Sequence, residues 1–246
     1  MAISVDTVYR TVLLIINKEQ RGYITPDEFN KTATQVQLEI FNEYFESLNQ
    51  QIRIQDNDTE YADRIKNLQE KIAIFQEDGI CLPTTGGFNI PGILNTPPVT
   101  DFYKLGTVIY NDDKEVQYVQ PNELLELNLS PITKPTKYWP IYTYKDFIIK
   151  VYPTTITTGI TCTYVRKPAN PIWNFTLGPN QQYIYNPSQY DAITNPGGSQ
   201  NFELHPIEQT NLITRILLYS GIVIKDPQIV QIAYQQAQAE SINSKS

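Results

Sequence analysis

The residues on which most enzyme active sites and metal sites depend are scarce in this chain. Its 246 residues include one histidine, His205, and two cysteines, Cys81 and Cys162. A single histidine excludes the metal motifs that need two, and a catalytic triad would have to use His205. Because His205 precedes Pro206 where a strand region gives way to a helix, we assign it a structural role. The cysteines have neither metal-site nor redox spacing, and two thiols are too few for a disulfide framework.

The acidic residues do not form a recognisable ion site. Asp56, Asp58 and Glu60 alternate as at the start of a calcium loop. Tyr61, however, occupies the position where the loop needs glycine, and Asn67 the position where it needs glutamate. We interpret this segment as a turn and helix cap. The chain is therefore predicted not to be an enzyme, with no catalytic residue, no cofactor and no metal.

Positive charge is also in short supply, since 19 Lys and Arg residues stand against 26 Asp and Glu residues, a formal net charge of −7. A protein that grips the phosphate backbone of nucleic acid needs clustered basic side chains, so that function is disfavoured. The charge balance is compatible with a negatively charged channel surface along which DNA slides. Such a surface releases no counterions from the DNA, so the DNA does not adhere to it. Ordinary solubility charge explains the balance at least as well.

Long hydrophobic runs are missing too. The longest aliphatic run, residues 12–16, is far too short to span a bilayer. The N-terminus has Asp6 and no basic start, which is not the pattern of a signal peptide. These features predict a soluble protein made in a reducing cytoplasm, with no membrane partner.

Tyrosine and proline, by contrast, are abundant, with 17 copies of each. Tyrosine buries a large apolar area and still forms a hydrogen bond, so a surplus is typical of contact surfaces. It is equally typical of β-strands. Both interpretations stay open at this point.

Residues 1–77 are predicted to be helical. Residues 25–28 (TPDE) form a capping box with proline at the first helical position, and the helix they open should run to about Arg53. Its apolar face drifts around the axis, which suits either different neighbours at the two ends or a helix curving over its own core. A second helix with a narrow apolar seam should complete an antiparallel hairpin. A preceding helix is predicted from the spacing of Val5, Val8, Tyr9, Val12, Leu13 and Ile16, with Gly22 as its stop.

Residues 78–205 are predicted to be rich in strands. Turn residues at 111–113 and 144–146 favour hairpins between neighbouring strands, and residues 120–127 a short helix. Within this region, residues 167–200 combine frequent prolines with large aromatic side chains, which indicates an extended arm pressed onto a solid surface. The predicted strands are 102–110, 114–119, 138–144, 146–152 and 159–166.

Residues 206–246 are predicted to be helical again, with the Asp226-Pro227 pair opening the last helix. The predicted fold class is thus α+β. It has an N-terminal helical hairpin, a central antiparallel β-sheet or barrel with a proline-rich extended arm, and a C-terminal helix pair. We expect the terminal helices to form one integrated unit.

Five stretches of the chain carry a resemblance to a known family. They are MAISVDTVYRTVLLIINKEQ (1–20), RGYITP (21–26) with EFN (28–30), YVRKP (164–168) with Trp173, QNFEL (200–204) and LITRILLYSGIVIKDP (212–227). Together they resemble a structural protein of crAss-like phages, the tailed phages of gut Bacteroidetes. In that group such chains look like ring proteins of the head–tail connector, or neck, beneath the portal. They are broadly similar to the tail adaptor proteins of short-tailed phages.

The resemblance implies a virion protein that is assembled in the host bacterial cytoplasm into a homo-oligomeric ring, with the twelve-fold symmetry of a portal. Its partners would be further copies of itself, the portal, and adjacent connector and tail proteins. Genomic DNA would pass through the lumen without sequence-specific binding. The alternative is a tail-associated receptor- or carbohydrate-binding module, because strands with exposed Tyr and Trp suit sugar stacking.

A ring subunit must bury surface on two sides of itself, and each contact should exceed roughly 1,000 Å². The aromatic residues of the proline-rich arm and of the drifting helix face are the candidates that the sequence offers. The predicted subunit-interface residues are Trp173, Phe175, Tyr183, Tyr185, Tyr190, Phe41 and Phe45.

Overall fold

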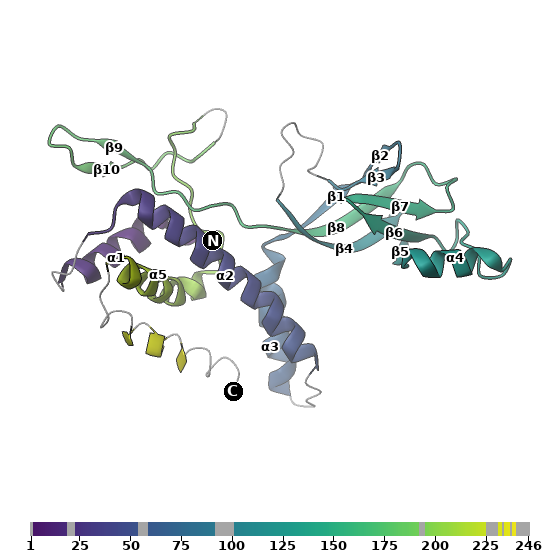
Figure 1. Ribbon diagram of the computed structural model, residues 1–246, viewed down its shortest axis with the longest axis horizontal. Helices are drawn as coiled ribbons and strands as arrows, with labels where there is room; N and C mark the ends of the chain where they lie inside the picture. Colours follow the sequence, from purple (N-terminus) through teal and green to yellow (C-terminus); the bar gives the residue numbers. More distant parts are fainter. Residues whose placement is uncertain are drawn as a thin grey trace. The chain divides into compact units, whose positions relative to one another are not determined.

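The computed structural model describes residues 2–18, 23–53, 59–91, 101–191 and 195–224, with several residues between 231 and 239. The chain divides into two compact units, each described here by itself. Unit 1 consists of Met1–Ile74 and Pro168–Ser246, and unit 2 of Phe75–Lys167 (Figure 1). The fold is the predicted mixture of helices and strands.

Unit 1 is helical, with one small hairpin. The helix α5 packs against α1 and α2, and α3 packs against α2 (Figure 1). The predicted opening of a last helix, at Asp226, lies outside the described residues, as do Gly22 and the turn before α3. The elements are α1 (Val5–Lys18), α2 (Pro26–Arg53), α3 (Thr59–Ala73), β9 (Phe175–Leu177), β10 (Tyr183–Tyr185), the 3₁₀-helix η1 (Pro206–Glu208) and α5 (Gln209–Ile224).

The drifting apolar face of α2 is covered by the chain itself. Phe29, Ile40 and Phe41 are all buried, and Phe45 is half-buried. Phe41 is only 1% exposed, so this predicted subunit-contact residue is a core residue of unit 1. The helix packs against α3 and α5, and its side chains Asn30 and Gln37 bind the backbone of the arm.

The capping box that opens α2 is present as predicted. The Thr25 backbone N–H donates to Glu28 Oε2 at 2.9 Å, and the Thr25 hydroxyl donates to the same oxygen at 2.8 Å. The Glu28 backbone N–H in turn donates to Thr25 Oγ1 at 3.4 Å. The two hydrogen bonds that Thr25 donates to its carboxylate lower the pKa of Glu28, and the bond from the backbone N–H has the larger effect. The capping contacts at the start of α2 are therefore made within four consecutive residues, 25–28.

Replacing Thr25 with alanine should lower the free energy of unfolding by about 1 kcal/mol, because an exposed helix-end amide loses its acceptor. Chemical denaturation measures this loss. Thr11→Ala, within α1, is the matched control and should change stability by less than about 0.5 kcal/mol. The pKa of Glu28 is lower in the folded chain than in the unfolded chain. The stabilisation that its carboxylate gives the fold is therefore complete above the ordinary carboxyl pKa and is lost as the pH falls through the pKa of the folded state. A Thr25→Ala effect that grows on acidification would contradict this account.

Unit 2 is built on an eight-stranded sheet of order β1-β8-β4-β5-β6-β7-β3-β2. The two end strands, β1 and β2, follow one another in the chain and are joined by Cys81, so the sheet nearly closes on itself. Every neighbouring pair is antiparallel except β5 and β6, which are parallel and are connected through α4 (Pro121–Leu129). The strands are β1 (Gln76–Ile80), β2 (Leu82–Thr84), β3 (Gly87–Asn89), β4 (Phe102–Tyr110), β5 (Lys114–Tyr118), β6 (Ile141–Lys145), β7 (Ile148–Tyr152) and β8 (Ile160–Arg166).

Both predicted hairpins form, β4 with β5 and β6 with β7. Their turns place two consecutive residues at positive φ, Asn111 (52°) with Asp112 (56°), and Asp146 (53°) with Phe147 (64°). Such tight turns match the twist of antiparallel strands. They also explain why β7 begins at residue 148 and not at the predicted 146. The interior is filled by Cys81, Phe88, Ile90, Val108, Val116, Tyr142, Ile149, Val151, Ile156, Ile160 and Cys162.

The predicted strand-rich region, 78–205, extends past the end of unit 2 at Lys167. Residues beyond this point bind the helices of unit 1. From α2, Gln37 Nε2 donates to the carbonyl of Ala169 at 2.7 Å, and Asn30 Nδ2 donates to the carbonyl of Trp173 at 3.2 Å. The arm therefore belongs with the helices, because its hydrogen-bond partners are there.

Candidate interaction surfaces

Trp173 anchors the arm to the first two helices of unit 1. Its side chain is 4% exposed, and its ring centroid lies 4.4 Å from that of Tyr9. Trp173 Nε1–H donates to Asp6 Oδ1 at 3.0 Å, and its backbone N–H donates to Asn30 Oδ1 at 2.8 Å. Trp173 is thus covered by its own chain, and the predicted subunit-contact role is corrected to that of an anchor.

An uncharged hairpin follows this anchor. Residues 168–190 contain no Asp, Glu, Lys or Arg. The strands β9 and β10 pair antiparallel, and the rings of Phe175 and Tyr185 stack on Trp173 at 5.9 and 5.7 Å. Phe175, Tyr185 and the later Tyr190 are half-buried.

Large apolar side chains are exposed on both faces of this hairpin. Its large exposed side chains are Leu177, Tyr183 and Ile184, which we call the hairpin surface; Leu177 is 65% exposed. Of the predicted contact residues, only Tyr183 belongs to it. Leu177 and Ile184 were missed, although a 23-residue stretch without charge was visible in the sequence.

Unit 2 exposes a larger apolar surface at α4. This helix, PNELLELNL, has no buried residue, although five of its nine residues are proline or leucine. More apolar residues follow it in the sequence. Ile132 is 95% exposed, Leu129 85% and Trp139 78%. Ile132 and Trp139 line the same groove, and apolar side chains that are exposed together in this way mark sites of interaction. The large exposed apolar residues of α4 and of the segment that follows it, which we name together the α4 surface, are Leu125, Leu129, Ile132, Tyr138 and Trp139.

A groove of about 630 Å³ runs beside this surface. Ile132 and Trp139 belong to both, and Tyr118 and Leu127 add further apolar wall. Its charged lining residues are Glu123, Glu126 and Lys134. The groove combines apolar and aromatic side chains with a few polar groups, a composition suited to binding a protein segment or a sugar.

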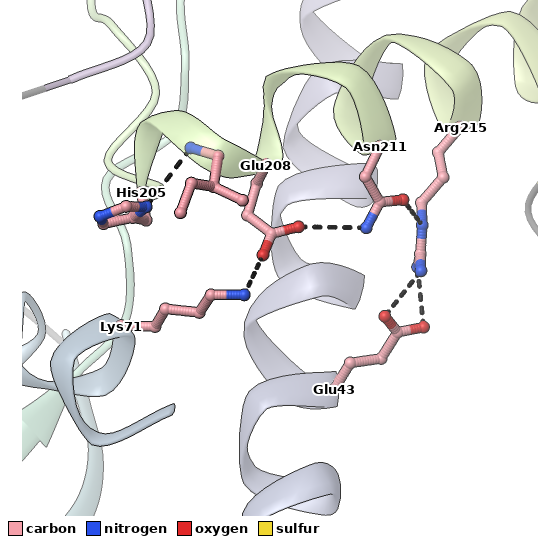
Figure 2. A network of polar contacts seen from close by, with 7 residues as sticks. Glu43, Lys71, His205, Glu208, Asn211 and Arg215 are labelled. Atoms are coloured by element: carbon pink, nitrogen blue, oxygen red, sulfur yellow. Dashed lines mark hydrogen bonds and ion pairs between the residues drawn. The ribbon is translucent and has the colours of Figure 1, made fainter. Parts of the chain in front are cut away.

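A polar network joins α2, α3 and α5 (Figure 2). Lys71 Nζ lies 2.6 Å from Glu208 Oε1, and Asn211 Nδ2 donates to the other oxygen of Glu208 at 3.2 Å. Arg215 Nε donates to Asn211 Oδ1 at 2.7 Å, and the guanidinium binds both oxygens of Glu43 at 2.8 and 2.6 Å. This continuous chain of contacts fixes the three helices relative to one another.

His205 stands at the edge of this network with a structural task. Its Nδ1 accepts a hydrogen bond from the Ile207 backbone N–H at 3.3 Å and so caps η1 (Figure 2). The ring is placed by the turn that precedes Pro206. The histidine therefore supports the start of the C-terminal helical segment, as the sequence indicated.

Replacing Glu208 with glutamine should lower the free energy of unfolding by about 2 kcal/mol, because the mostly buried ammonium of Lys71 loses its charged partner. Denaturant titration of the purified chain measures the change. The control is Lys31→Gln, which breaks the exposed pair with Asp27 and should cost less than about 1 kcal/mol. Equal effects of the two substitutions would show that burial of the network contributes nothing.

Within the described ranges, no group of three or more His, Cys, Asp or Glu side chains could hold a metal ion. The helices of those ranges also include none long and apolar enough to cross a membrane. No protein-family model matches the chain, and no curated protein matches it. The hairpin surface and the α4 surface are the candidate functional sites of the described residues.

Proposed function

We propose that this chain is a structural protein of a phage virion, one copy in the ring of the head–tail connector that joins portal to tail. The α4 surface carries the proposal: Leu129, Ile132 and Trp139 are each more than three-quarters exposed. Burial of a side chain of this size is favourable by roughly 1.5–3 kcal/mol relative to leaving it exposed to water. Another protein surface that covers these side chains would recover this free energy.

A closed ring needs two different surfaces on every subunit, one for each neighbour. The chain supplies two, the hairpin surface on unit 1 and the α4 surface on unit 2. The hairpin brings Leu177 and Ile184 without any charge that would have to be desolvated. We assign these two surfaces to contacts with adjacent copies or with the portal, and the DNA exit channel to the lumen of the ring.

The experiment is to mix the purified full-length chain with the portal of the same phage and to determine the composition by native mass spectrometry. The expected product carries twelve copies of the chain per portal. A monomer in isolation is compatible with the proposal, because a portal can template the ring. Failure to bind the portal would contradict it.

The second candidate, a tail-associated carbohydrate-binding module, is favoured by one observation. The exposed ring of Trp139 lines the groove together with the carboxylates of Glu123 and Glu126. An aromatic face beside carboxylates suits the stacking and hydrogen bonding of a sugar. Glycan binding by a monomer or trimer that ignores the portal would favour this candidate over the ring.

A further inference from the structure

The two cysteines, 81 positions apart in sequence, meet inside unit 2. Cys81 connects β1 to β2, and Cys162 lies within β8. Both side chains are buried, at 2% and 1% exposure, and their sulfurs are 3.2 Å apart. Their spacing in the sequence left their disulfide state open, and the nearly closed sheet brings them together as a pair.

The strand register explains why the sulfurs meet. Gly79 lies directly opposite Cys162 in the β1–β8 pair, and the Cys81 backbone N–H donates to the carbonyl of Ile160 at 2.9 Å. Alternate residues of a strand share one face, so Cys81 lies on the inner face with Cys162, one step along the diagonal. Because Gly79 has no side chain, the nearest side chain for the sulfur of Cys162 across this pair is Cys81.

We propose that Cys81 and Cys162 are a disulfide-forming pair, which a small-molecule disulfide oxidises to an intramolecular crosslink. The bond length of a disulfide is about 2.05 Å, so the sulfurs need to approach by about 1.1 Å, a movement within reach of side-chain rotation. Cys81 and Cys162 are the two cysteines of the sequence, and folding brings their sulfurs within 3.2 Å of each other. The crosslink is therefore expected within one chain and not between chains.

The chemistry is two successive thiol–disulfide exchanges. The Cys81 thiolate attacks the oxidant, a mixed disulfide forms and one small thiolate leaves. The Cys162 thiolate then attacks the sulfur of Cys81, and the second small thiolate leaves. The two protons of the cysteines pass to the leaving groups, so the protein loses two hydrogens and the oxidant is reduced to two thiols. Contact with Cys162 lowers the pKa of Cys81 in the folded chain, so Cys81 is the better nucleophile there, and in the unfolded chain either thiol can react first.

The crosslink would hold the sheet at its closing point. Cys81 separates the two end strands, β1 and β2, and Cys162 lies on the strand that pairs with β1. The bond would close a loop between cysteines 81 positions apart, which strongly reduces the conformational entropy of the unfolded chain. Unit 2 is thus expected to be appreciably more stable when oxidised.

The test uses the full-length chain, unfolded in urea and refolded in a buffer of reduced and oxidised glutathione. Unfolding first gives the oxidant access to both thiols, so burial cannot prevent the reaction. Intact mass should fall by the two hydrogens of one disulfide, and peptide mapping without reductant should join the peptides of Cys81 and Cys162. The disulfide should be at least about 100-fold more favourable in the folded chain than in urea. The thermal midpoint should rise by roughly 10 °C or more.

The control variants are Cys81→Ala and Cys162→Ala, which should show neither the mass loss nor a midpoint that depends on oxidation. The measurements on the unmodified chain decide the matter even if these variants fold poorly. Two free thiols after refolding, a crosslink between chains, or equal disulfide equilibria in the folded and unfolded states would each overturn the proposal. None of these outcomes bears on the ring, which needs no disulfide.

Discussion

Replacing Trp173 with alanine is expected to lower the free energy of unfolding of unit 1 by about 3–5 kcal/mol, the cost of removing a large buried aromatic side chain. The indole is packed on Tyr9 and its N–H donates to Asp6, so the substitution removes a packing contact and one of the hydrogen bonds to that carboxylate. The hairpin should also become protease-sensitive, because Phe175 and Tyr185 lose the ring on which they stack. Denaturant unfolding and limited proteolysis of the isolated chain measure both effects.

The matched control for this substitution is Leu177→Ala, at an exposed position of the same hairpin. It should change stability by less than about 0.5 kcal/mol. If Trp173 acted only at a contact between subunits, its replacement would leave the isolated chain unchanged and weaken only the assembly. That result would restore the contact role which the structure replaces with an anchor.

The double substitution Ile132→Asp with Trp139→Ala is expected to leave the fold intact and to abolish the assembly. Both side chains are mostly exposed, so the free energy of unfolding should change by less than about 1 kcal/mol. Binding should weaken by at least about 30-fold, because buried aromatic anchors are worth 2 kcal/mol or more at interfaces. Thermal unfolding and titration against the portal separate the two readouts.

Ile80→Asp provides the charge-matched control for the α4 surface. Ile80 is also an exposed isoleucine of unit 2, but it lies on the end strand β1, far from α4 in the strand order. The Ile80→Asp variant should bind the portal with the same affinity as the unsubstituted chain. A loss of binding from Ile80→Asp equal to that of the double variant would mean that general surface charge, and not the α4 surface, controls the assembly.

Features that depend on a few consecutive residues were predictable from the sequence. The capping box at Thr25, the turn at 111–112 and the helix at α4 each follow from local chemistry, and the structure places them as expected. The strand β1 was missed because its sequence, QEDGI, is mostly polar. The strands β2 and β3 were missed because each is only three residues long, and β2 contains Pro83. The small β9–β10 hairpin was missed because prolines at 171, 179 and 187 surround it.

The candidate surfaces were only partly predictable, because exposure depends on contacts between distant residues. Trp173 is buried by Asp6 and Asn30, which lie more than 140 positions away, so its aromatic character alone could not separate an anchor from a contact residue. The exposure of Leu125 and Leu129 could not be foreseen either. Their spacing predicts a helix face that packs on a core, and only the fold reveals that nothing in α4 is buried.

The central claim is that the α4 surface binds a protein neighbour in a ring, and native mass spectrometry of portal mixtures tests it most directly. The unsubstituted chain and Ile80→Asp are expected to give a complex with twelve copies per portal. Ile132→Asp with Trp139→Ala is expected to leave the portal bare while remaining folded. Equal occupancy of the portal by all three proteins, or by none, would contradict the account.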